Sequence, residues 1–187
     1  MQHHLIKIRE LLDRMEQAYS ITAAQMGFNC RGCRDNCCRS LFFHHTVAEF
    51  FWLQSGMSLL PQIRQAKIKA RASDQTALDI RPGDKILCPL NESGRCILYP
   101  YRPMICRLHG IPHELRRPDG QRLTGPGCDD FYRQTNPAKS LRFDRTPWYA
   151  ALAQLEKQLR REIGHEGKIN MTIAQMLITE TPRLEIP

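Results

Sequence analysis

The sequence predicts a mainly α-helical fold: one domain over residues 1–187, in which helices flank an irregular, proline- and glycine-rich region that carries cysteines and a small hairpin. Near both ends of the chain, apolar residues recur at spacings of three and four, the period of an amphipathic helix. Between residues 80 and 140, prolines and glycines are too frequent for a long helix. A chain of 187 residues is long enough to bury a core of its own, and we find no internal repeat in it.

The first helix is expected over residues 5–19. Its apolar positions lie on one face with charged residues between them, and such a stripe usually faces the core of a soluble domain. The stripe consists of Leu5, Ile8, Leu12, Met15 and Tyr19. We therefore expect this helix to pack against other helices rather than to form a groove for a partner.

A second helix is expected over residues 47–54. Thr46 and Glu49 have the spacing of a capping box, in which the two side chains satisfy backbone N–H groups at a helix start. Ser55-Gly56 is expected to interrupt the helix, because glycine is a poor helix former.

A third helix is expected over residues 59–72. Leu60, Ile63 and Ile68 form a weak apolar stripe, and the opposite face is basic. That face is the best candidate surface for an acidic protein partner, although a solvent-exposed helix face is the simpler interpretation.

A small β-hairpin is expected within the irregular centre, over residues 113–125. Pro118-Asp119-Gly120 is a typical turn sequence between two short segments.

The C-terminal helices are expected over residues 146–178. Thr146 is the expected N-cap, Pro147 the first helical residue and Gly164 the C-terminal signal. A short final helix is expected after Thr172, which would cap it.

The chemistry expected of the cysteines depends on the cellular compartment, because the compartment decides whether thiols are reduced or oxidised. The N-terminal segment contains no uninterrupted apolar run, so we expect neither a signal peptide nor a membrane span, and a cytoplasmic location. Thiols stay reduced there, which favours metal binding or redox chemistry over disulfides. The eight cysteines are Cys30, Cys33, Cys37, Cys38, Cys88, Cys96, Cys106 and Cys128.

The spacing of the first four cysteines favours a metal site. Cys30 and Cys33 form C-x2-C, which lets two sulfurs from one loop bind a single ion. Cys37 and Cys38 are adjacent, and because neighbouring side chains diverge, one of them is expected to serve a second ion, to bridge or to stay free. The four later cysteines are expected to complete one or two sulfur-rich sites, so that folding would depend on metal.

The cysteine motifs follow one another in a set order: C-x2-C-x3-C-C, then CPL, then GRCILYPYRPMICRLHG, with Thr46 and Glu49 at a helix start between the first two. This order resembles the YkgJ-type cysteine-cluster family, a zinc- or iron-chelating domain. The family run has two residues, rather than three, between the positions of Cys33 and Cys37. The resemblance covers residues 28–130, the predicted metal-binding region, and implies chelation by the cysteines without supplying a reaction.

Ligand type alone leaves the metal open. Thiolates suit zinc, and they equally suit an iron–sulfur cluster such as [4Fe–4S] with a redox or accessory role. The absence of a ferredoxin-type cysteine run favours zinc slightly. His109 is expected to hydrogen-bond a thiolate rather than to replace one, and Arg102 and Arg107 are expected beside the ligands.

The net charge of +8 suggests an anionic partner, but it counts every cysteine as neutral. Eight thiolates on two divalent ions would lower it to about +4. A nucleic-acid-binding zinc module is therefore a third interpretation, and the missing zinc-finger spacings argue against it. No phosphate-binding loop or HExxH motif indicates an enzyme.

Overall fold

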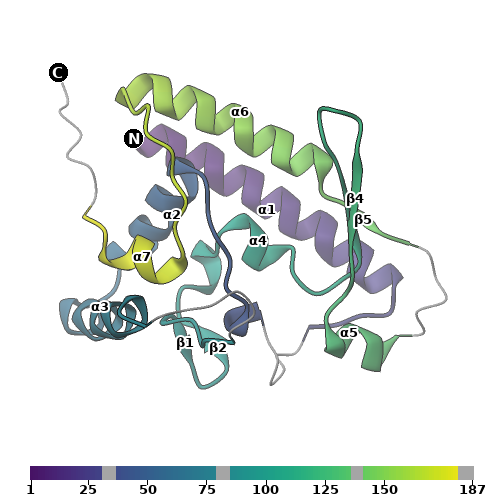
Figure 1. Ribbon diagram of the computed structural model, residues 1–187, viewed down its shortest axis with the longest axis horizontal. Coiled ribbons are helices and arrows are strands. Elements are labelled where there is room, and N and C mark those ends of the chain that lie inside the picture. The colour runs from purple at the N-terminus through teal and green to yellow at the C-terminus, as the bar shows by residue number, and fades with distance from the viewer. Residues whose placement is uncertain (31–36, 79–84, 136–140, 181–187) are drawn as a thin grey trace.

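The computed structural model describes residues 1–30, 37–78, 85–135 and 141–180. Within these ranges the fold is mainly helical, as the sequence predicts, with seven α-helices and two small sheets. Figure 1 shows α1 (Gln2–Gln25) and α6 (Thr146–Ile163) lying side by side along one edge of the molecule. Several shorter elements, among them β1 (Asn91–Glu92), β2 (Arg95–Cys96) and α5 (Asp129–Gln134), lie along the other edge (Figure 1).

The predicted stripe of α1 is buried. Ile8, Leu12 and Met15 are at most 1% exposed, and the helix continues beyond residue 19 to Gln25. On α6, Leu152 and Leu159 face the core, and Gly164 ends the helix with a φ of 64°, which favours glycine.

The start of α6 differs from the prediction by one residue, because Arg145 rather than Thr146 is the N-cap. The Thr146 hydroxyl instead accepts the N–H of Arg116 at 2.9 Å, and the Thr146 N–H is bound by Asp144 at 2.8 Å. Thr146 therefore joins the helix start to the neighbouring strands.

Helix α2 (Val47–Ser58) begins after Thr46 as predicted, but Ser55-Gly56 does not interrupt it. Gly56 lies against the ring of Tyr101, where a Cβ atom would come within 2.4 Å of the ring. Glycine at this position lets the continuous helix approach the ring of Tyr101 closely. The capping box is also only half formed: the Thr46 hydroxyl accepts the N–H of Glu49, but the Glu49 carboxylate binds the Thr46 hydroxyl and the N–H of Met104 rather than the N–H of Thr46.

Helix α3 (Gln62–Thr76) begins three residues later than predicted, after Pro61. Ile68 is buried, but Ile63 is 69% exposed, so the predicted stripe was wrong at that position. α3 packs against α7 (Ile173–Ile178), where Thr172 forms a complete capping box with Gln175.

Within the described part of the centre, residues 85–135, all elements are short, as predicted. The small sheet β1 (Asn91–Glu92) and β2 (Arg95–Cys96) is antiparallel. The helical pieces of the centre are the 3₁₀ turn η2 (Tyr99–Tyr101) and the helices α4 (Met104–Arg107) and α5 (Asp129–Gln134). A further 3₁₀ turn, η1 (Cys37–Arg39), lies earlier in the chain, between α1 and α2.

The predicted hairpin is confirmed as β3 (His113–Arg116) and β4 (Arg122–Gly125). The sequence did not predict β5 (Phe143–Asp144), which pairs in parallel with β3 on its other edge. No helix in the described ranges is both long and apolar enough to cross a membrane.

Candidate metal centre

Backbone hydrogen bonds bring Cys38 and Cys88 together from separate segments. The carbonyl of Cys38, in η1, accepts the N–H of Cys88 at 2.7 Å. The carbonyl of Cys88 then accepts the N–H of Asn91 at 2.9 Å, which forms a turn into β1. The first cysteine run is thus joined to the segment around Cys88.

The β1–β2 hairpin returns Cys96 to the same place. Ser93 and Gly94 at its tip have φ values of 51° and 83°, as in a type I′ turn, whose twist suits a two-residue hairpin. The side chain of Asn91 accepts the N–H of Gly94 at 3.1 Å, and Asn91 pairs with Cys96 across the strands.

Cys106 lies on α4, and a buried carboxylate holds that helix. Glu49 of α2 is 4% exposed and accepts the N–H of Met104, the first residue of α4, at 2.9 Å. Its other oxygen accepts the Thr46 hydroxyl at 2.7 Å. Burial raises the pKa of Glu49, but contacts with His44, Thr46 and Met104 outweigh it and lower the pKa overall. The residue is therefore an ionised anchor for α4.

Cys38, Cys88, Cys96 and Cys106 form what we call the four-thiol set. Burial raises the pKa of Cys88 to about 12 and that of Cys96 to about 11, and it also raises the pKa of Cys106. Repulsion between thiolates adds to this effect in every pair within the set. These thiols, which come from η1, from the turn and hairpin over residues 88–96 and from α4, therefore lie within electrostatic range of one another.

Cys37 and Cys38 are distinguished by a hydrogen bond. A hydrogen bond between the two thiols raises the pKa of Cys37 and lowers that of Cys38. Asn91 and Arg102 lower the pKa of Cys38 further. Of the two adjacent cysteines, Cys38 is the one poised as a thiolate next to Cys88 and Cys96.

Cys30 and Cys128 lie near a different group, the hydroxyl of Tyr19. Burial raises the pKa of Tyr19, and charges on Cys30, Cys128 and Cys37 raise it further. Cys128 is the N-cap of α5, its sulfur accepting an N–H at 3.4 Å, and Gln134 of the same helix holds the backbone of Asn29, next to Cys30. Cys33 lies outside the described residues.

The described cysteines line two adjoining cavities. The first has a volume of about 480 Å³ and mostly apolar walls, including Leu41, Phe42 and Leu98; its cysteines are Cys30, Cys37, Cys38, Cys88, Cys96 and Cys106. The second, of about 560 Å³, reaches Cys128 and shares Cys30, Cys37 and Cys106 with the first.

The sulfurs are near one another without forming a tight cage. No disulfide joins any two of the seven cysteines that the structure describes. Nor do any three of their sulfurs lie within 4.8 Å of one another. Zn–S bonds of about 2.3 Å separate tetrahedral sulfurs by about 3.8 Å, so a single zinc ion would have to draw the segments closer.

Arg102 and Arg107, the two arginines expected beside the ligands, both pair with Glu16 of α1, and only Arg102 has a described contact with a cysteine. Arg102 contacts Glu16 at 2.9 Å and donates to the carbonyl of Cys106 at 3.3 Å. Arg107 is 4% exposed and binds Glu16 and the carbonyls of Pro100 and Arg102. Arg102 favours the thiolate form of Cys37, Cys38, Cys96 and Cys106.

His109 lines the second cavity together with Cys106 and Cys128. Its carbonyl accepts the Tyr19 hydroxyl at 2.6 Å, and its ring lies 5.6 Å from that of Phe42. Burial, followed by the charge of Arg145, lowers its pKa, so the imidazole is neutral. No described group of three close ligand atoms includes it.

Sequence reasoning missed Glu16 and the contact from Glu49 to Met104. Glu16 lies on the exposed side of a helix pattern, and its arginine partners are more than 80 residues away. The position of Glu49 did predict a role at a helix start, in the capping box of α2. Its carboxylate accepts the N–H of Met104 at the start of α4 instead.

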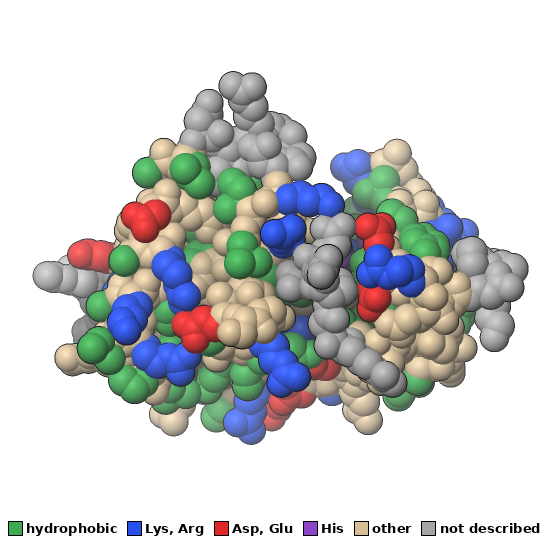
Figure 2. Space-filling model, turned by 90° about the horizontal axis from the view of Figure 1, so that it is seen from below, with side chains coloured by type: hydrophobic (Ala, Val, Ile, Leu, Met, Phe, Trp, Pro, Cys, Tyr) green, Lys and Arg blue, Asp and Glu red, His purple; other side chains and the backbone are tan. Residues whose placement is uncertain are grey.

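Comparisons with family models, with curated proteins and with solved structures found no match to this chain. Figure 2 shows the face that includes α3, β1, β2 and α5, where the described lysines and arginines are spread among acidic and apolar side chains. That distribution differs from the continuous basic surface typical of nucleic-acid binding.

Proposed function

We propose that this protein binds a metal, zinc or iron, through cysteine thiolates, with the four-thiol set as its main ligands. The observation that carries the proposal is the convergence of Cys38, Cys88, Cys96 and Cys106, from three separate segments, on one cavity. The YkgJ-type motif order supports the same chemistry. No catalytic reaction is assigned.

A cation would resolve an electrostatic conflict within the four-thiol set. Burial and mutual repulsion keep Cys88 and Cys96 protonated at neutral pH, with pKa values of about 12 and about 11. Fixed positive charges offset this only in part, from Arg71 at Cys88 and from Arg102 at Cys96. A divalent ion or a cluster stabilises coordinated thiolates directly, and its binding releases their protons.

The remaining cysteines are candidates for a second site. Cys30, Cys37 and Cys128 lie near Tyr19, and Cys33 follows Cys30 by three positions in the sequence. Cys37 and Cys106 line both cavities, so the two groups adjoin.

Two considerations favour different metals. The missing ferredoxin run favours zinc. The separation of the described sulfurs favours an iron–sulfur cluster, because a cluster holds its cysteine sulfurs further apart than a single ion does. The proposal therefore includes both zinc and an iron–sulfur cluster. A redox or accessory role is proposed only if the metal is an iron–sulfur cluster.

Metal analysis tests the proposal. The protein is purified without oxygen, its visible spectrum is recorded, and zinc, iron and acid-labile sulfide are measured. Stoichiometric zinc in a colourless protein identifies a zinc site, whereas a brown protein with matching iron and sulfide identifies a cluster. A protein that holds neither, and takes up neither on reconstitution under reducing conditions, would overturn the proposal.

A further inference from the structure

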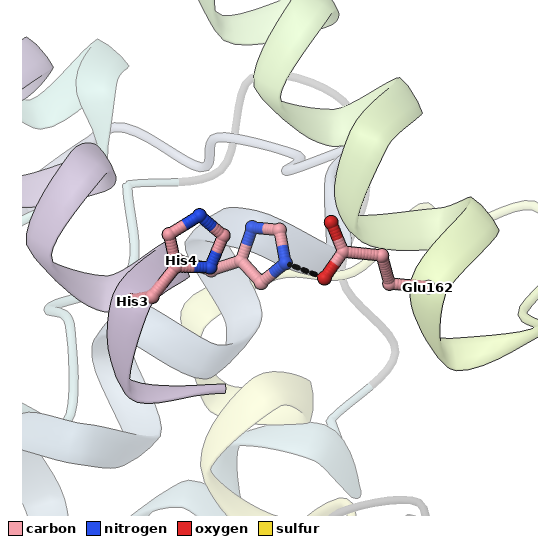
Figure 3. A group of neighbouring side chains, drawn as sticks. All are labelled: His3, His4 and Glu162. Carbon is pink, nitrogen blue, oxygen red and sulfur yellow. Dashed lines mark hydrogen bonds and ion pairs between the residues drawn. The ribbon is translucent and has the colours of Figure 1, made fainter.

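A second set of metal-type ligands lies far from the cysteines, where the first turn of α1 meets the last turns of α6. It consists of His3, His4 and Glu162, whose ligand atoms all lie within 4.8 Å of one another. Among the described residues no other group of three His, Cys, Asp or Glu side chains meets that distance. Figure 3 shows the two imidazoles adjacent on α1 and the carboxylate reaching them from α6.

The three side chains differ in exposure in a way that suits ion binding. His4 is 2% exposed, so its ring is fixed by packing, and its Nε2 lies 2.6 Å from the Glu162 carboxylate. His3 is exposed, and its ring centroid lies 4.4 Å from that of His4. One rigid ligand is therefore flanked by two that can adjust their positions.

The donor chemistry is that of zinc. Two imidazole nitrogens and a carboxylate oxygen are a ligand set that zinc takes with water in the fourth position. Zinc bonds of about 2.0–2.1 Å place tetrahedral ligand atoms about 3.3 Å apart, so the carboxylate must move back from His4 by less than a bond length. Glu162 is 57% exposed and has room for that movement.

Local charges act in both directions. The positive end of the α1 dipole and Lys7, which lies within electrostatic range of Glu162, oppose a cation. The Glu162 carboxylate offsets them, and hydrogen bonding to His4 holds its pKa below the usual range. The carboxylate is therefore ionised and ready to bind a metal at neutral pH.

We propose that His3, His4 and Glu162 form a zinc site that links the start of α1 to the end of α6. The ion takes the place of the hydrogen bond between His4 and Glu162. Its fourth position faces solvent, beside the exposed His3. This site uses nitrogen and oxygen ligands from segments that carry none of the cysteines, so it does not depend on the thiol-bound metal.

Calorimetric titration of zinc into the protein, with its thiol sites already filled, tests the site. The intact protein is expected to take up one additional ion, with a rise in melting temperature because the bound ion links two helices. Glu162→Gln and His3→Ala change exposed side chains and should leave the fold intact. Altering partners outside the ligands already weakens metal binding about 10–100-fold, so losing a ligand should cost at least ~100-fold.

The matched controls are Glu166→Gln and His45→Ala, which alter exposed residues outside the group. Both should bind the additional ion as the unchanged protein does, and zinc should shift the imidazole NMR signals of His3 and His4 but not that of His45. The proposal is overturned if the unchanged protein takes up no ion beyond the thiol-bound metal. It is equally overturned if Glu162→Gln and His3→Ala bind the additional ion with undiminished affinity.

Discussion

Glu49 accepts the backbone N–H of Met104 at 2.9 Å, across 55 positions of sequence, and so fixes the helix that carries Cys106 to the most buried helix of the core. A second buried carboxylate, Glu156, does comparable work elsewhere: it accepts the N–H groups of Val47 and Ala48, each at 2.9 Å. Both stabilise the fold, but only Glu49 reaches an element that carries a cysteine.

Glu49→Ala and Glu156→Ala should therefore separate stability from metal binding. Each leaves buried donors unpaired, and we expect each to lower the free energy of unfolding by about 2–4 kcal/mol. Only Glu49→Ala should also reduce metal content, because α4 loses its anchor. Denaturant unfolding and metal analysis of the two variants check this, and equal metal content in both would contradict it.

The adjacent cysteines should respond differently to substitution. Cys38 interacts with all the other members of the four-thiol set, whereas Cys37 is hydrogen-bonded to it. We expect Cys38→Ser to lose the metal bound by that set, whereas Cys37→Ser should keep that metal and lose at most the metal of the adjoining second site. Metal per chain, measured after dialysis, is the readout. Retention by Cys38→Ser together with loss by Cys37→Ser would reverse the assignment.

Arg102 should set the pH at which metal is taken up. Its charge favours the thiolate form of four cysteines, so its removal should raise their pKa values. Deprotonation, and with it metal uptake, then moves to higher pH, by about one unit for Arg102→Gln. Titrating metal binding against pH measures the midpoint. Arg117→Gln, in the distant hairpin turn, is the control and should leave the midpoint unchanged.

The sequence could predict those features of the fold and of the site that depend on residues close together in the chain, but not those that depend on residues far apart in it. Local patterns were sufficient for the cap at Thr172 and the hairpin around residues 118–120, because those signals lie within a few residues. The four-thiol set was not identifiable, since eight cysteines allow many groupings and only the fold brings Cys38 to Cys88.

The same argument applies to glycine and histidine. The sequence predicted a helix break at Gly56, because the residue that explains this glycine, Tyr101, is 45 positions away and gives no local signal. His3 and His4 carried no metal-site spacing, because their third partner, Glu162, comes from the other end of the fold.

His113 should stay neutral at pH values well below the usual pKa of a histidine side chain. Burial, followed by the charge of Arg145, lowers its pKa to about 4, compared with about 6.5 in an unfolded chain. The unfolded state therefore binds more protons between these values, and the free energy of unfolding falls as pH decreases from about 6.5 towards 4. An NMR titration of the imidazole should give a midpoint near 4. A midpoint above 6 would contradict the prediction.

Gly56→Ala should reverse the usual rule for helices. In the interior of a helix, alanine is normally more favourable than glycine by about 1 kcal/mol. Here the added Cβ would lie 2.4 Å from the ring of Tyr101, which packs against Trp52 with ring centroids 4.8 Å apart. Overpacking of this kind costs about 1–3 kcal/mol, so the variant should be less stable than the unchanged protein.

Ser55→Ala, one residue earlier in the same helix, is the matched control for Gly56→Ala. Ser55 loses one hydrogen bond, from its hydroxyl to the carbonyl of Trp52, and gains helix propensity. Its effect on the free energy of unfolding should be within about 0.5–1 kcal/mol of zero. Because Tyr101 immediately precedes Arg102, displacement of its ring should also disturb the charge nearest the thiols. Gly56→Ala is therefore expected to weaken metal binding, whereas Ser55→Ala is not, and a stabilised Gly56→Ala protein would show that the ring moves aside at no cost.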